Sequence, residues 1–139
     1  MGVALEIVVY LVVGLAAMML GYLIIDLIHP ADFPKEIQEG NTAVGWLSAG
    51  IYGGLGFIIR SALVSFQQSE AQDLLHGVGS TAIYSAIGIV AFVIGYFVVD
   101  ILNKKYKLND EIMNRNEAAG IMVFGIFLGL AFVVSGVIQ

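Results

Sequence analysis

Four stretches of the chain contain no Asp, Glu, Lys or Arg, and each is about as long as a lipid bilayer is thick. They cover residues 7–25, 40–59, 74–99 and 118–139. The hydrocarbon core of a bilayer is about 30 Å thick, and a helix crosses it with roughly 20 residues. A buried helix of a soluble bundle would carry polar residues along one face, and none of these stretches does. We therefore predict an all-α integral membrane protein with four spanning helices.

The composition supports lipid as the main solvent of this chain. Hydrophobic residues make up 59% of its 139 residues and charged residues 12%, whereas soluble domains carry about 25% charged residues. The absence of cysteine excludes disulfides and Cys-ligated metals. A net charge of −5 without a basic stripe argues against nucleic-acid binding. His29 and His76 are far apart and show no ligand spacing, so we expect neither a metal nor a cofactor.

The basic residues predict how the chain is oriented in the membrane. Five of the six lie in the polar loops 29–41 and 103–117, and Arg60 alone belongs to the opposite side. Because cytoplasmic loops carry an excess of Lys and Arg, we expect both loops in the cytoplasm and both termini outside.

The chain matches itself when one half is placed on the other. An offset of 74 residues aligns the ends of the first and third spans, and an offset of 75 aligns the second and fourth. The first offset pairs Tyr10, Gly14, Gly21, Tyr22 and Asp26 with Tyr84, Gly88, Gly95, Tyr96 and Asp100. The second pairs Glu36, Asn41, Gly45, Gly50 and Gly54 with Glu111, Asn116, Gly120, Gly125 and Gly129. We therefore predict a four-helix bundle of two parallel two-helix repeats, residues 1–66 and 77–139, joined by an extracytoplasmic link, 67–76.

These motifs resemble a known bacterial family. A first span that ends in Gly-Tyr-x3-Asp, a loop that ends in Glu-Ile-x3-Asn, and a second span that reads Ala-x-Gly-x4-Gly-x3-Gly-Leu occur twice here. Together they are similar to domain-of-unknown-function family 350, the YjfL-like small bacterial inner-membrane proteins, also grouped as UPF family 0719. The resemblance covers essentially the whole chain. It implies an integral, multi-pass protein of the bacterial inner (plasma) membrane, made of paired two-helix modules with no assigned biochemistry.

The two repeated carboxylates, Asp26 and Asp100, are the first candidates for a functional site. Carboxylates in a membrane helix are costly and are often functional, and Tyr22 and Tyr96 lie one turn before them on the same helix face. Pro30, however, places Asp26 within about one turn of the interface. One interpretation is a structural latch, in which each Asp accepts a hydrogen bond from the start of the next span. The other is a proton- or cation-binding role.

Asparagines and glycines indicate how the spans begin and pack. Asn41 and Asn116 stand where the second and fourth spans start, and Asn is a favourable N-cap. Small residues four apart let helices approach closely in lipid, which predicts helix packing, within the chain or between subunits. The four glycines in this pattern are Gly50, Gly54, Gly125 and Gly129.

The second polar loop is rich in lysine. Lys104, Lys105 and Lys107 follow the third span directly. Lysines at this place attract anionic lipid head groups, by about 1 kcal/mol each. The alternative is that they only set the topology of the chain.

The sequence contains no catalytic motif, so we predict a protein that is not an enzyme. The function that fits best is an oligomeric scaffold or sensor component of the cell envelope. Its partners would be the lipid bilayer, further copies of the chain, and a cytoplasmic protein at the two polar loops. The alternative is a small oligomeric channel or carrier for protons, cations or small amines that uses the Asp pair.

Overall fold

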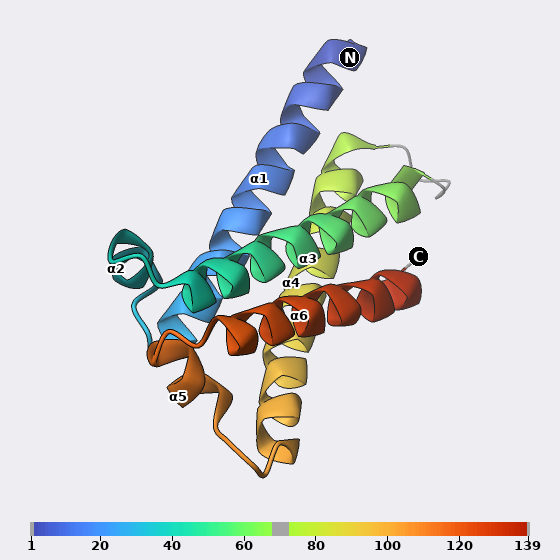
Figure 1. The fold of residues 1–139 in the computed structure, drawn as a ribbon. Helices are drawn as coiled ribbons and strands as arrows, with labels where there is room; N and C mark the ends of the chain where they lie inside the picture. Colours follow the sequence, from blue (N-terminus) through green and yellow to red (C-terminus); the bar gives the residue numbers. More distant parts are fainter. Residues whose placement is uncertain (1, 68–72, 139) are drawn as a thin grey trace.

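The computed structural model describes residues 2–67 and 73–138, and six helices make up its regular structure (Figure 1). Four are long and two are short. In chain order they are α1 (Val3–Ile28), α2 (Phe33–Gln38), α3 (Thr42–Gln67), α4 (Leu74–Leu102), α5 (Leu108–Met113) and α6 (Glu117–Ile138). No strand occurs within the described ranges, so the predicted all-α class is confirmed.

The four long helices are the predicted membrane spans. Each is long and apolar enough to cross a bilayer, over Val3–Ile28, Thr42–Ser65, Leu74–Leu102 and Glu117–Ile138. The large side chains exposed on these helices are almost all hydrophobic, and α1 exposes them on nearly every side. A helix that is apolar all round needs lipid or protein around it. The outside of this bundle is therefore suited to lipid.

The two short helices were not predicted from the sequence. They interrupt the polar loops, α2 between α1 and α3, and α5 between α4 and α6. Asp32 begins α2 by accepting a hydrogen bond from the Lys35 amide at 3.4 Å, and Pro34 occupies the first turn, where no amide donor is needed. Six residues are too few to show a helical pattern in a sequence.

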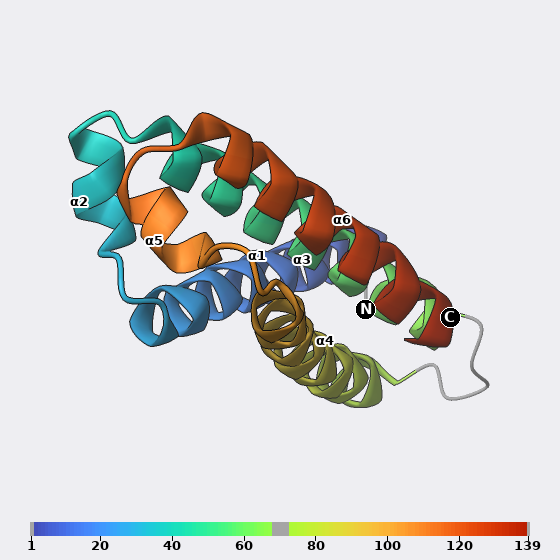
Figure 2. The same ribbon diagram turned by 60° about the horizontal axis from the view of Figure 1, so that its bottom comes forward.

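The helices α3 and α6 lie side by side along their length and form the tightest contact in the bundle (Figures 1 and 2). The interface depends on glycines of α3. A Cβ atom at Gly50 would come within 2.9 Å of the Phe124 Cα atom, and one at Gly54 would overlap the Phe92 ring. The predicted close packing is therefore found at these two residues.

The two predicted packing glycines of α6 behave differently. A Cβ atom at Gly125 or Gly129 would meet nothing within 4 Å, so neither makes a close contact inside the chain. Gly120 makes that contact instead, 2.6 Å from the backbone of Ala43. The prediction for Gly125 and Gly129 is wrong within one chain because α6 contributes large side chains, such as Phe124 and Phe127, to the gaps that α3 leaves.

The helices α1 and α4 lie across the α3–α6 pair and enclose the core (Figure 2). Leu55, Ile58, Phe92 and Phe127 fill the middle of the bundle and are at most 1% exposed. Both polar loops lie at one end of the bundle, and both termini point toward the other (Figure 1). Half of the predicted link 67–76, residues 68–72, lies outside the described residues, and the division of the chain into two repeats and a link stays a prediction.

Candidate functional site

The candidate site is the end of the bundle made by residues 29–41 and 103–117, which we call the polar face. Its first feature is the position of Asp26 and Asp100. Asp26 Oδ1 accepts a hydrogen bond from the Phe33 amide at 3.0 Å, and Asp100 Oδ1 accepts one from the Leu108 amide at 3.3 Å. Both carboxylates are half-buried. Each therefore holds a short helix against the end of the span before it.

This arrangement corrects the latch expected from the sequence. We expected each carboxylate to reach the start of the next span, near Asn41 or Asn116. The actual donors are the first residues of α2 and α5. The amide of the first helical residue has no acceptor within its own helix. A nearby carboxylate accepts its hydrogen bond, and the negative charge of the carboxylate interacts favourably with the positive N-terminal end of the helix dipole.

The asparagines cap the next spans as predicted. Asn41 Oδ1 accepts from the Ala43 amide at 3.1 Å and the Val44 amide at 3.4 Å, and Asn116 Oδ1 accepts from the Ala118 amide at 3.1 Å. Each Asn also donates from Nδ2, over 2.8 Å, to a Glu of the short helix before it. The two acceptors are Glu36 for Asn41 and Glu111 for Asn116.

The two loops also bind each other, mainly through Asn41. This side chain is 2% exposed, and its Nδ2 atom donates to the Ile112 carbonyl at 3.0 Å. An exposed ion pair, Arg115 Nη2 to Glu39 Oε2 at 3.8 Å, adds a second contact. Asn116 is exposed and has no such bond among the described residues. The polar face is thus one connected unit, and Asn41 is its main junction.

The two tyrosines are not hydrogen-bonded to the carboxylates. Tyr22 Oη pairs with Ser48 Oγ at 3.0 Å, and its ring stacks on Tyr52 at 4.5 Å between ring centres. Tyr96 Oη donates to Asn109 Oδ1 and lies 3.5 Å from His29 Nε2. Each tyrosine thus shares a helix face with an aspartate, but its hydroxyl group bonds to other residues.

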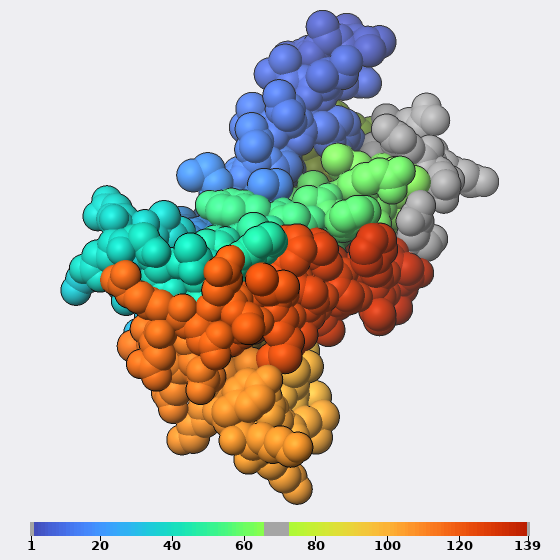
Figure 3. All heavy atoms as spheres, in the orientation of Figure 1, coloured from blue at the N-terminus to red at the C-terminus, as the bar shows by residue number. Residues whose placement is uncertain are grey.

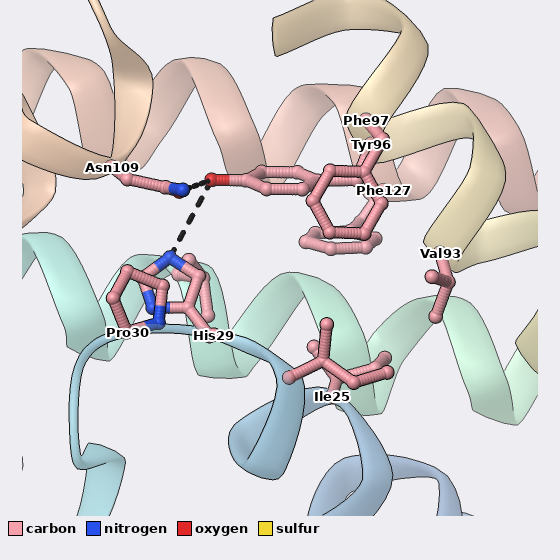
Figure 4. A pocket seen from close by; sticks show the side chains of 10 residues that line it. Ile25, His29, Pro30, Val93, Tyr96, Phe97, Asn109 and Phe127 are labelled. Carbon is pink, nitrogen blue, oxygen red and sulfur yellow. Dashed lines mark hydrogen bonds between the residues drawn. The ribbon is translucent and has the colours of Figure 1, made fainter.

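A small cavity of about 30 Å³ lies beside Tyr96, between the two halves of the chain (Figure 4). His29 and Asn109 provide its polar side, and Ile25, Val93 and Phe127 are among its apolar walls. The volume is enough for about one water molecule. Burial lowers the pKa of His29, while the hydrogen bond to Asn109 and the charges of Asp26 and Asp100 oppose that change. The net effect is a lowered pKa, which favours the neutral imidazole.

Sequence reasoning missed the cluster of His29, Tyr96 and Asn109. The alignment of the two halves places His29 opposite Asn103 and Asn109 opposite Pro34, so the cluster has no second copy. The residues meet only because α1, α4 and α5 converge at this end of the bundle. A histidine directly before Pro30, at the end of a span, was the one signal in the sequence.

The remaining candidates lie apart from this network. Lys104, Lys105 and Lys107 are exposed in the connection between α4 and α5, and their contact with lipid head groups stays a prediction. Within the described residues no group of three His, Asp or Glu side chains is placed to hold a metal ion. The carboxylates are separated from the opposite end of the bundle by the buried rings and aliphatic side chains of the core.

Four bilayer-length helices with apolar outer surfaces and a polar face at one end define a multi-pass integral membrane protein. The chain belongs to the family described as Domain of Unknown Function (DUF350), whose model matches residues 1–138. The resemblance seen in the sequence motifs is thus confirmed.

Two relatives are similar over most of this chain. The "UPF0719 transmembrane protein YshE" of Bacillus subtilis (strain 168) is 30% identical over 130 residues, which cover 94% of this chain and 90% of the relative. A "UPF0719 transmembrane protein" of Aquifex aeolicus (strain VF5) is 25% identical over 127 residues, 90% of this chain and 46% of the relative, so this chain spans about half of its length. No solved structure matches the chain.

Proposed function

We propose that this protein is a non-enzymatic scaffold or sensor component of a bacterial plasma membrane, and that its polar face is the docking surface. The observation that carries the proposal is the network at that face. Asp26 and Asp100 fix the short helices to the spans, and the bond from Asn41 to the Ile112 carbonyl joins the loops. A partner that binds a preordered surface loses less conformational freedom on binding. The fold thus favours recognition by a protein at this end.

The proposal includes an orientation with the polar face in the cytoplasm and the termini outside. Five basic residues at the polar face against one at the other end support it. A reporter active only outside the cytoplasm should be active after Gln139 and silent at Lys105. The reverse pattern would contradict the orientation.

The proposal also includes self-association through α6. The positions Gly125, Gly129 and Gly136 have open space where a side chain would stand, and small residues of this kind allow close contact between helices in lipid. Because the chain has no cysteine, a single Gly129→Cys variant reports cleanly on this face. It should cross-link to a second copy in native membranes, whereas Gly79→Cys, open but on α4, should not. Equal cross-linking at both positions would contradict the assignment.

The alternative function, a channel or carrier for protons, cations or small amines, depends on the same carboxylates. Both of them lie at one end and are engaged as helix caps, and the interior beyond them is filled by residues such as Phe92 and Phe127. We therefore favour the scaffold.

A flux assay separates the two functions. The purified chain in liposomes is compared with a folded Asp26→Asn, Asp100→Asn variant for proton, K⁺ and polyamine flux. The scaffold predicts no flux above empty liposomes for either protein. Flux that the double variant abolishes would refute the scaffold and establish transport.

A further inference from the structure

A wide groove opens at the end of the bundle opposite the polar face. It has a volume of about 810 Å³ and lies between the first half of α1, the second half of α3 and the start of α4. Figure 3 shows the first turns of α1 standing clear of α3. Its walls are largely apolar, with Ile7, Leu11 and Leu15 on α1 facing Ile59 and Leu63 on α3.

Two opposite charges line this apolar groove. Glu6 on α1 and Arg60 on α3 both contribute to its surface, and both are exposed. Neither forms an ion pair in the described part of the chain. Charged groups next to hydrocarbon are costly unless they reach the interface or find a partner of opposite charge. A ligand for this groove should therefore carry one positive group, one negative group and an apolar tail.

We propose that the groove binds a phospholipid with a primary amine in its head group, of the phosphatidylethanolamine class. The acyl chain lies along the apolar walls, the Arg60 guanidinium binds the phosphate, and the Glu6 carboxylate accepts hydrogen bonds from the ammonium group. Guanidinium groups match phosphate oxygens with two parallel donors. Glu6 stands one turn inside the start of α1, and Arg60 about two turns inside the end of α3, so both side chains can extend toward the head-group layer.

The glycine at position 56 provides a direct way to close the groove. Gly56 lines it, and a Cβ atom there would meet nothing within 4 Å. The Cβ atom of a Gly56→Leu side chain therefore has open space, and the side chain would enter the space of the acyl chain. Gly45 is the matched control, because it is on the same helix, is equally open and lies outside the groove.

The test is native mass spectrometry of the full chain released from detergent. Phosphatidylethanolamine, phosphatidylcholine and phosphatidylglycerol with identical acyl chains are added in turn. We expect phosphatidylethanolamine to be retained best, because phosphatidylglycerol lacks the cation and the quaternary amine of phosphatidylcholine cannot donate a hydrogen bond. Gly56→Leu should reduce retention of all three lipids, and Gly45→Leu should not.

Substitution of the charged residues separates the two head-group contacts. Arg60→Gln should weaken retention of every lipid by about tenfold or more, the usual effect of losing a charge-assisted bond. Glu6→Gln should remove the preference for phosphatidylethanolamine and leave retention of phosphatidylglycerol intact. Retention that Gly56→Leu leaves unchanged would overturn the proposal. A Gly56→Leu variant that lowers the oligomer mass while the lipid stays bound would assign the groove to a second copy of the chain and would overturn it as well.

Discussion

Replacing Asn41 and Asn116 one at a time measures how strongly the two loops are joined. Both side chains cap the span that follows them and bind a Glu of the short helix before them. Only Asn41 is buried and reaches across to the Ile112 carbonyl. The matched alanine substitutions therefore share the cost of a lost cap, and they differ by the cost of breaking the junction.

The magnitudes follow from the contacts of each side chain. Losing an N-cap Asn costs about 1 kcal/mol, which is the whole expected effect of Asn116→Ala. Asn41→Ala also removes the Nδ2 donor of the Ile112 carbonyl, which keeps the Arg115 amide as a donor at 3.1 Å. One buried hydrogen bond is lost, at a cost of about 0.5–1.5 kcal/mol. We therefore expect a loss of about 1.5–2.5 kcal/mol in the free energy of unfolding for Asn41→Ala.

The assay is reversible unfolding of the purified protein in mixed detergent micelles, followed by circular dichroism. Asn41→Asp is the second variant, because it keeps the capping oxygen and removes only the Nδ2 donor. It should lose nearly as much stability as Asn41→Ala at neutral pH, since it also places a charge next to Glu36. Equal losses for Asn41→Ala and Asn116→Ala would refute the assignment of Asn41 as the junction.

Three further predictions concern backbone strain, helix packing and pH. Gly40 and Arg115 adopt left-handed φ angles of 79° and 63°, so in unfolding assays Arg115→Gly should stabilise the loop by up to about 1–2 kcal/mol and Gly40→Ala should destabilise it. Gly120→Ala should lower stability by about 1–3 kcal/mol, because the new Cβ atom would lie 2.6 Å from the Ala43 backbone of α3. Gly45→Ala should have no such cost, because a Cβ atom there has open space. Burial lowers the pKa of His29 below its ordinary 6.5, so near that pH the folded state binds fewer protons than the unfolded state. The free energy of unfolding should therefore be highest above about pH 6.5 and fall as the pH drops through the lowered folded-state pKa. In a His29→Gln variant this pH dependence of the free energy of unfolding should be weaker.

The spans and their caps could be predicted from the sequence because their signals are local. Stretches without charges set the four long helices, and an Asn directly before an apolar stretch marks where α3 and α6 begin. The matched bonds at Asp26 and Asp100, and at Asn41 and Asn116, also agree with the alignment of the two halves.

The rest depends on contacts between segments far apart in the chain. The carboxylates were correctly identified as residues at the ends of spans, but their partners belong to helices too short to leave a pattern. Gly50 and Gly125 look alike in the sequence, yet only Gly50 lies against a neighbouring helix, because α6 presents Phe124 to it. His29 meets Tyr96 through the packing of α1 against α4, which no single stretch of sequence contains.

Amide hydrogen exchange at Phe33 and Leu108 tests most directly whether the polar face is a fixed surface. Each is the first residue of a short helix, where the amide has no acceptor within the helix. The hydrogen-bond acceptors of these two amides are Asp26 and Asp100. By NMR in detergent or nanodiscs, both amides should exchange slowly in the native chain, and Asp26→Ala should release Phe33 while Leu108 stays protected. Exchange of both amides at the rate of an open loop in the native chain would contradict the account.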